Sequence, residues 1–233
     1  MKTIRFPTPD ALFDHAAARI AAVAAEAVRA RGRFVVALAG GATPRPLYQR
    51  LARAATVDWT AAHVFFSDER CVPADDPASN FGAAKASLLD RVGIPDGQVR
   101  RVAGERNPID AADAYEVLVR DALGPEGRFD CVLLGLGADG HTASLFPRHQ
   151  ALTETDRWVL PVHVSTEPAW RVTLTLPPIN AAHRVLFLAV GAAKANAVRA
   201  LVERAPIPAA HVRPSGGECT LLVDTEAATL LDA

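Results

Sequence analysis

The sequence predicts an α/β protein, in which a mainly parallel, Rossmann-like sheet carries helices on both faces. Short apolar runs of strand length alternate with longer stretches of helical character, and this alternation is typical of parallel sheets. Several runs, such as residues 34–39, are apolar at every position, as strands covered on both faces are. The chain contains neither an internal repeat nor a low-complexity linker, so we expect a single domain over residues 1–233.

The first half of the chain contains several helix-start signals. Thr8 is a capping residue followed by a proline, and Thr43–Pro44 and Asn107–Pro108 repeat this pattern. Ser79 is expected to cap a further helix. Read in order, these signals and the apolar runs predict a helix over 8–32, a strand over 34–39, a helix from 43, a strand over 64–67, a loop to 77, and helices over 79–91 and 107–124.

The second half opens with an apolar strand over residues 129–134, which runs into a glycine-rich segment. The proline-rich residues 205–214 are expected to form a loop. Further apolar runs predict strands over 159–164, 171–176, 185–190 and 220–223, with a helix over 192–203 among them.

Composition and charge narrow the kind of protein. Half of the 233 residues are hydrophobic, which excludes a disordered chain and allows a substantial buried core. The formal net charge of −1 points to neither nucleic acid nor an anionic membrane as a partner. The N-terminal residues lack the apolar core of a signal peptide, and charges interrupt the Ala-rich stretch 16–30. We expect a cytoplasmic protein that is a monomer or a small homo-oligomer.

The cysteines and histidines give no sign of a disulfide framework or a metal site. Cys71, Cys131 and Cys219 are far apart and include no Cys-x-x-Cys pair, so reduced thiols are expected. The histidines other than His141 have no ligand-like spacing. We therefore expect no bound metal.

Three segments follow apolar strands directly and carry groups suited to chemistry: residues 40–43, 68–70 and 135–141. In sheets of parallel strands, ligands bind beyond the carboxyl ends of the strands. We therefore expect these segments to meet and to form an active site.

The first segment has features of a phosphate-binding turn. Gly40 and Gly41 allow a tight turn and a close approach of the backbone to a ligand. The following helix start offers free N–H groups and a positive dipole end, and Thr43 adds a hydroxyl donor. An ordinary strand-to-helix turn with a Thr-Pro cap has the same pattern, so this segment alone leaves both interpretations open.

Residues 135–140 match the G-x-G-x-x-G pattern of dinucleotide-binding folds. That pattern should open a long helix, but Pro147 disfavours helix at Phe146 and leaves room for little more than one turn. The acidic residues about 20 positions later, Glu154 and Asp156, lie in a polar stretch and not at a strand end. We therefore predict a flexible loop that presents Asp139 and His141 into a cleft.

Asp139 and His141 are suited to acid–base chemistry. An imidazole titrates near neutral pH and can take a proton from water, and a nearby carboxylate could orient it. The alternative is a structural turn histidine. Arg70, Arg171 and Lys194 are candidate ligands for an anion, although each taken singly could be a surface cation. Lys194 falls in the first turn of a predicted helix, where the helix dipole disfavours a cation.

These segments together resemble the 6-phosphogluconolactonase family, within the wider group that includes glucosamine-6-phosphate isomerase/deaminase. The matching stretches occur in family order across nearly the whole chain: 38–51 (LAGGATPRPLYQRL), 65–73 (FFSDERCVP), 79–89 (SNFGAAKASLL), 134–147 (LGLGADGHTASLFP), 171–181 (RVTLTLPPINA) and 187–197 (FLAVGAAKANA). The resemblance implies hydrolysis of 6-phospho-D-glucono-1,5-lactone to 6-phosphogluconate in the oxidative pentose phosphate pathway, with no cofactor.

The resemblance also implies roles for the candidate residues. His141 would activate water, and Asp139 would orient either His141 or a sugar hydroxyl. The remaining roles divide between the two ends of the substrate: Gly40, Gly41, Thr43, Arg171 and Lys194 would hold the phosphate, while Asp68 and Arg70 would line the sugar side. The sequence departs from the family at Ala39 and Ala42, where serines usually flank the glycines, so two hydroxyl donors are missing.

Two alternatives accompany this expectation. The isomerase/deaminase branch shares Asp68 and the Asp-Gly-His turn, but it resembles GHIAFNEP after its glycines, whereas this chain reads GHTASLFP. Phe146 thus stands where that branch has a glutamate paired with the histidine. A non-catalytic sugar-phosphate sensor would keep the phosphate loop and the cations without needing His141.

Overall fold

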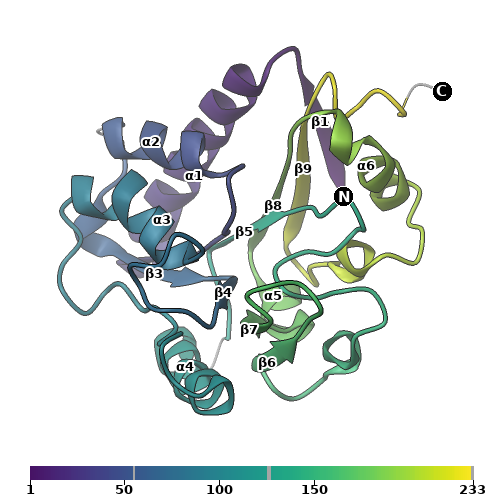
Figure 1. Cartoon of the computed structure of the whole chain (residues 1–233). Coiled ribbons are helices and arrows are strands. Elements are labelled where there is room, and N and C mark those ends of the chain that lie inside the picture. The colour runs from purple at the N-terminus through teal and green to yellow at the C-terminus, as the bar shows by residue number, and fades with distance from the viewer. Residues whose placement is uncertain (55, 125–126, 232–233) are drawn as a thin grey trace.

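The computed structural model describes residues 1–54, 56–124 and 127–231. Its larger sheet has the strand order β1-β9-β8-β5-β2-β3, and every neighbouring pair is parallel (Figure 1). The strands of this sheet are β1 (Lys2–Phe6), β2 (Phe34–Leu38), β3 (Ala62–Phe66), β5 (Cys131–Gly135), β8 (Arg184–Ala189) and β9 (Glu218–Asp224). The predicted α/β class with a mainly parallel sheet is confirmed.

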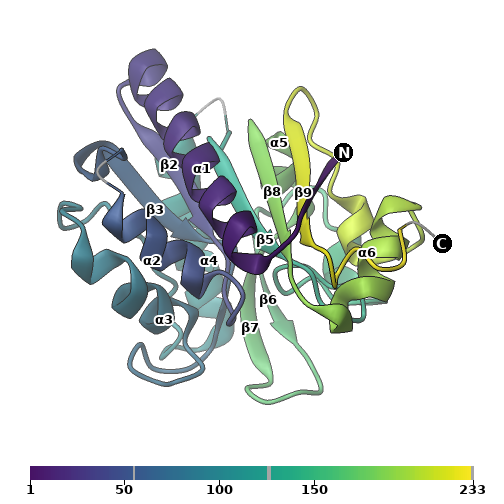
Figure 2. The same cartoon turned by 90° about the horizontal axis from the view of Figure 1, so that it is seen from above.

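Helices cover both faces of this sheet, as predicted. The helices are α1 (Pro9–Arg31), α2 (Arg45–Arg53), α3 (Asn80–Ser87), α4 (Pro108–Leu123), α5 (Leu176–Ala181) and α6 (Ala195–Val202). Figure 2 shows α1, α2 and α3 gathered on one side, and the buried residues of α4, α5 and α6 belong to the core of the opposite face. Short 3₁₀ turns occupy Trp59–Ala61, Leu89–Arg91, Gln150–Thr153, Ala192–Lys194 and Pro208–His211.

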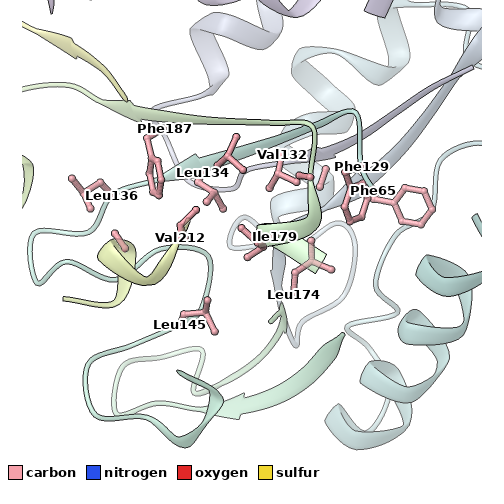
Figure 3. Close-up of a cluster of buried hydrophobic side chains, with 14 of the residues drawn as sticks. Phe65, Phe129, Val132, Leu134, Leu136, Leu145, Leu174, Ile179, Phe187 and Val212 are labelled. Carbon is pink, nitrogen blue, oxygen red and sulfur yellow. The ribbon is translucent and has the colours of Figure 1, made fainter. Parts of the chain in front are cut away.

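Successive side chains of a strand point to opposite faces of the sheet, and a hydrophobic core covers each face. The strands are therefore apolar at nearly every position. In β2, Phe34, Val36 and Leu38 pack toward α1, whereas Val35 and Ala37 face the other way. Figure 3 shows part of the core on the face opposite α1, where side chains from β5 and β8 meet residues from α5 and from the loops. Leu136 and Leu145, 4% and 0% exposed, belong to this core and anchor both ends of the glycine-rich segment.

The helix caps follow the sequence signals closely. Thr8, Ser79 and Asn107 accept main-chain N–H bonds from Ala11, Gly82 and Ile109 at 3.2, 3.0 and 2.9 Å. Gly32 ends α1 in the left-handed conformation, with φ 72°. Two predicted starts are shifted: α2 begins at Arg45 without a side-chain cap from Thr43, and α6 begins at Ala195 after a 3₁₀ turn that contains Lys194.

A second, antiparallel sheet corrects part of the prediction. It has the order β4-β7-β6, formed by β4 (Asp68–Arg70), β7 (Trp170–Leu174) and β6 (Val159–His163). The runs 159–164 and 171–176 contain strands β6 and β7, although Leu176 already begins α5. The short connection between the two strands permits an antiparallel hairpin, which pairs with β4 and not with the parallel sheet. Three elements were not predicted: β1 is an edge strand with exposed positions, β4 covers residues 68–70 that were expected to follow a strand, and α5 is short and contains two prolines.

The topology defines where a ligand can bind. From β2 the chain passes to β3 on one side, and the next strand of the large sheet, β5, lies on the other side of β2. A crevice forms at such a switch point because the connections from the two neighbouring strands diverge. The segments that leave this point are residues 39–44 after β2 and residues 136–142 after β5.

Candidate active site

A cavity of about 330 Å³ lies at this switch point. All predicted site residues except Asp139 line it, namely Gly40, Gly41, Thr43, Asp68, Arg70, His141, Arg171 and Lys194. They come from the connections that follow β2 and β5, from β4 and β7 of the antiparallel sheet, and from the turn before α6, although they lie far apart in the sequence. Asp139 reaches the cavity only through its contact with His141.

The glycine turn presents unused donors to this cavity. The N–H groups of Gly40, Gly41, Ala42 and Thr43 donate to no other described residue. The turn is nevertheless anchored, because the Tyr48 hydroxyl donates to the Ala39 carbonyl at 2.6 Å. Free N–H groups at the entry to a helix are suited to a phosphate group.

Asn80 makes glycine necessary at position 40. A Cβ atom on Gly40 would lie 2.0 Å from Asn80 Oδ1 and 2.2 Å from its Nδ2, so the amide packs directly on the Gly40 backbone. Asn80 is 2% exposed, and its Oδ1 has no hydrogen-bond partner among the described residues.

Arg70 and Arg171 form a pair of like charges on the antiparallel sheet. They are directly opposite each other in the register of β4 and β7. Each guanidinium group bonds to a main-chain carbonyl, Arg70 to Ala78 at 2.6 Å and Arg171 to Pro168 at 2.8 Å. Neither forms an ion pair with a carboxylate of the described residues, and the buried Nε of Arg70 lacks a partner among them.

Opposed like charges destabilise a sheet, and burying a charge without an ion pair is costly, although the nearby charges of Asp68 and Glu69 act in the opposite direction on Arg171. Burial, and secondly the charge of Arg70, lower the pKa of the Arg171 guanidinium. Both side chains line the cavity, so a bound anion would relieve the repulsion. Lys194 adds a third cation to the lining; no ion pair or side-chain hydrogen bond joins it to the described residues.

Asp139 and His141 form a close pair. Asp139 Oδ1 lies 2.5 Å from His141 Nδ1 and also accepts the His141 main-chain N–H at 3.1 Å. Burial alone would raise the pKa of the Asp139 carboxyl, but these bonds outweigh it and hold the pKa below its ordinary value. An ionised Asp139 accepts a hydrogen bond from the Nδ1–H of the ring, so Nε2 is the basic nitrogen. Of the two predicted partners for Asp139, this geometry favours His141 over a sugar hydroxyl.

The segment that carries this pair is a tight turn, whereas the sequence suggested a flexible loop. Gly137 donates its N–H to the His141 carbonyl at 2.8 Å, and Gly140 donates to the Gly137 carbonyl at 3.0 Å. The Thr142 hydroxyl closes the turn on the Gly135 carbonyl at 2.8 Å. No long helix follows, which agrees with the rejection of a dinucleotide fingerprint.

Sequence reasoning did not identify three residues that organise the cavity. The Ser144 hydroxyl donates to Asp68 Oδ2 at 2.8 Å, and Asn80 Nδ2 donates to the Asp68 carbonyl at 2.9 Å. Behind them, Glu69 is 2% exposed and accepts the N–H groups of Asn80 and Phe81, both at 2.7 Å. A usable signal was present, since all three lie within the stretches that carry the family resemblance.

Glu69 joins β4 to the start of α3. Burial is the largest influence on its carboxyl and raises the pKa, while the bonds from Phe81, Asn80 and Arg70 act in the opposite direction. Ser79, which caps α3, also donates its hydroxyl to Glu69 at 3.1 Å. The carboxylate therefore fixes the start of α3 against β4, and with it the position of the Asn80 amide.

The described part of the chain contains neither a metal-binding cluster nor a membrane-spanning helix. Residues 1–54, 56–124 and 127–231 contain no group of three or more His, Cys, Asp or Glu side chains arranged to hold a metal ion. Among the same residues, no helix has the length and apolar character needed to cross a bilayer.

Comparison with known proteins identifies the family. Residues 7–221 match the family described as glucosamine-6-phosphate isomerases/6-phosphogluconolactonase. A 6-phosphogluconolactonase of Synechocystis sp. is 39% identical over 211 residues, covering 87% of this chain and 86% of the relative. Its counterpart in Mycobacterium tuberculosis is 39% identical over 238 residues, covering 97% and 96%.

A solved structure supports the same assignment. The 6-phosphogluconolactonase from Trypanosoma cruzi has a TM-score of 0.88 at 32% identity, over 100% of this chain and 97% of that one. The fold, the order of the motifs and the cavity at the switch point therefore lead to one conclusion: the chain belongs to the glucosamine-6-phosphate isomerase/6-phosphogluconolactonase family.

Proposed function

We propose that this protein hydrolyses 6-phospho-D-glucono-1,5-lactone to 6-phosphogluconate, in the oxidative pentose phosphate pathway. The observation that carries the proposal is the position of His141. Its ring, held by Asp139, lies in the same cavity as the free N–H groups of the glycine turn and the Arg70–Arg171 pair. A base and an anion site in one cavity suit water attack on a phosphorylated substrate. The names of the relatives support the same substrate.

The chemistry follows from the free nitrogen of His141. Nε2 takes a proton from a water molecule, and the water oxygen bonds to the lactone carbonyl carbon, whose π electrons move to the carbonyl oxygen. When the tetrahedral intermediate collapses, the bond from that carbon to the ring oxygen breaks. The imidazolium returns its proton to the departing ring oxygen, and the new carboxylic acid ionises in water. Asp139 stabilises the imidazolium between the two transfers.

The substrate is oriented by the two ends of the cavity. Gly40, Gly41 and Thr43 would hold the phosphate with their N–H groups, together with Arg171 and Lys194. Asp68 and Arg70 would line the sugar side. Because alanines at positions 39 and 42 supply no hydroxyl, phosphate binding depends more heavily on backbone donors and the cations.

The domain organisation, cellular location and oligomeric state proposed here are those predicted from the sequence. The whole chain, 1–233, acts as one lactonase domain in the cytoplasm, as a monomer or a small homo-oligomer. The reaction needs no cofactor, because the carbonyl of a lactone accepts water directly. Light scattering coupled to size-exclusion chromatography would measure the oligomeric state.

Phe146 distinguishes the proposed activity from the isomerase/deaminase alternative. Its ring stacks on His141 where that branch carries a glutamate, so the histidine has no second carboxylate for the additional proton transfers. Asp68 is present in both branches and does not separate them. A non-catalytic sugar-phosphate sensor would bind the same ligand and would differ from the proposed enzyme only in lacking turnover.

A direct rate comparison tests the proposal. Freshly generated 6-phosphogluconolactone is followed with and without enzyme, with the His141→Ala variant, and with glucosamine 6-phosphate as the competing substrate. We expect acceleration by the native protein, a loss of about 10²- to 10⁴-fold in His141→Ala, and retained binding of 6-phosphogluconate. Binding of 6-phosphogluconate without any turnover would establish a sensor, and release of ammonia from glucosamine 6-phosphate would establish a deaminase.

A further inference from the structure

Phe146 contacts the proposed base directly. The phenyl and imidazole rings of Phe146 and His141 are stacked, with their centroids 4.5 Å apart and their planes inclined by 29°. Phe146 is half-buried, lines the cavity and packs against the core of one face of the sheet. Its neighbour Leu145 is 0% exposed, so the backbone that carries the phenyl ring is firmly anchored.

Two further groups approach the imidazole along one edge. Asp139 binds Nδ1, and the Gly137 backbone approaches the same edge so closely that a Cβ atom there would lie 2.1 Å from Nδ1 and 2.3 Å from Cε1. These contacts restrain the ring along that edge alone, and a tilt of the ring would also distort its bond to Asp139. The imidazole is also partly open to solvent, with 33% of the His141 side chain exposed.

A tilt of the ring would move Nε2, which is the atom that must accept a proton from the attacking water. A proton transfer requires the donor and acceptor within hydrogen-bond distance and in line, and small misplacements of a catalytic group reduce the rate steeply. The phenyl face adds to the restraint that Asp139 and Gly137 place on this tilt. An aromatic face also attracts a cation, so it favours the imidazolium that forms during the reaction.

We infer that Phe146 is a positioning residue, which holds the imidazole of His141 in the plane that directs Nε2 at the attacking water. The inference rests on the proposed function, in which His141 is the base. Phe146 then affects turnover only by holding His141, and it has no effect on phosphate binding.

The chain offers a matched control. Phe6 and His15 form a second half-buried Phe–His pair, with centroids 5.0 Å apart and planes inclined by 44°. Neither residue lines the cavity. Replacing Phe6 by leucine removes an aromatic ring from a histidine in the same protein without touching the site.

The experiment is a double-mutant cycle on lactone hydrolysis. We expect Phe146→Leu to lower kcat about 10- to 100-fold with KM changed less than about twofold, Phe146→Tyr to recover most of the rate, and Phe6→Leu to match the native protein. In the His141→Ala background, Phe146→Leu should change the residual rate by less than about twofold. An additive loss in that background, or a loss carried by KM, would overturn the inference.

Nuclear magnetic resonance separates this inference from the proposed function. We expect the Nδ1–H signal of His141, protected by Asp139, to be observed in the native protein and in Phe6→Leu, and to be lost to exchange in Phe146→Leu. Absence of lactone turnover in the native protein would reject the proposed function, while the signal would still test the positioning. An unchanged signal in Phe146→Leu would reject the positioning even if the native enzyme is active.

Discussion

Asp139 Oδ1 accepts two hydrogen bonds from His141, one from the main-chain N–H at 3.1 Å and one from ring Nδ1 at 2.5 Å. One carboxylate oxygen thus fixes both the backbone and the ring of the same residue. The proposed base therefore has a defined tautomer before any ligand arrives.

Asp139→Asn tests this relationship. The amide keeps the shape of the carboxylate but cannot stabilise the imidazolium, so we expect kcat to fall by about 10²- to 10⁴-fold with little change in KM. Because the pKa of Asp139 is lowered, the native carboxylate stays ionised through the neutral range, and its protonation should reduce the rate only on the acid side. The pH profile of kcat measures both effects. Asp90→Asn, which alters a surface pair with Lys85, should behave as the native protein does.

Gly137→Ala should displace the base without altering any charge. The added methyl group would overlap the imidazole and Asp139 Oδ1, which lies 2.5 Å from the ideal Cβ position. We expect a loss of kcat of at least about tenfold, because the Asp139–His141 pair must separate. Gly93→Ala is the control, since a Cβ there meets nothing within 4 Å and its φ is not positive. Equal activity of the two variants would contradict the contact.

Lys194→Ala should weaken substrate binding and leave the chemical step intact. Loss of one phosphate contact is expected to raise KM about 10- to 100-fold, with kcat changed by less than about threefold. Competition by inorganic phosphate should weaken in parallel. Lys85→Ala removes a lysine that is half-exposed and paired with Asp90 outside the cavity, and should leave KM unchanged. A fall in kcat alone would assign Lys194 to the chemistry.

Glu116→Gln should destabilise the fold in a pH-dependent way. Burial raises the pKa of the Glu116 carboxyl, but bonds from the Trp158 N–H, Arg157 and Arg120 outweigh burial and lower the pKa from its ordinary value of 4.5. A carboxyl with a lowered folded-state pKa contributes stability above the ordinary value, and loses it as the pH falls through the folded-state pKa. We expect a loss of about 1–2 kcal/mol at pH 7 that shrinks below about pH 4.

Urea denaturation at both pH values measures this difference. Glu203→Gln is the control, because its exposed pair with Arg199 on α6 should contribute no more than about 0.5 kcal/mol. A pH-independent loss in Glu116→Gln would indicate that packing of the side chain, and not its charge, stabilises α4 against β6.

Much of the fold follows from local patterns in the sequence. Continuous apolar runs predict strands buried on both faces, and Thr8, Ser79 and Asn107 mark helix starts that the structure confirms. The positions of the three polar segments after strands also predict where the cavity lies. These features depend on neighbouring residues, so the sequence alone determines them.

Only the tertiary structure decides which groups meet. The sequence predicts a strand that begins at residue 171 and overruns its end at Leu174, yet nothing local indicates that Arg171 would stand opposite Arg70 in a separate antiparallel sheet. The same holds for the stacking of Phe146 on His141 and for the amide of Asn80 on Gly40. Such contacts depend on register and on the path of the turns, which are set when the whole core packs and leave no periodic signal along the chain.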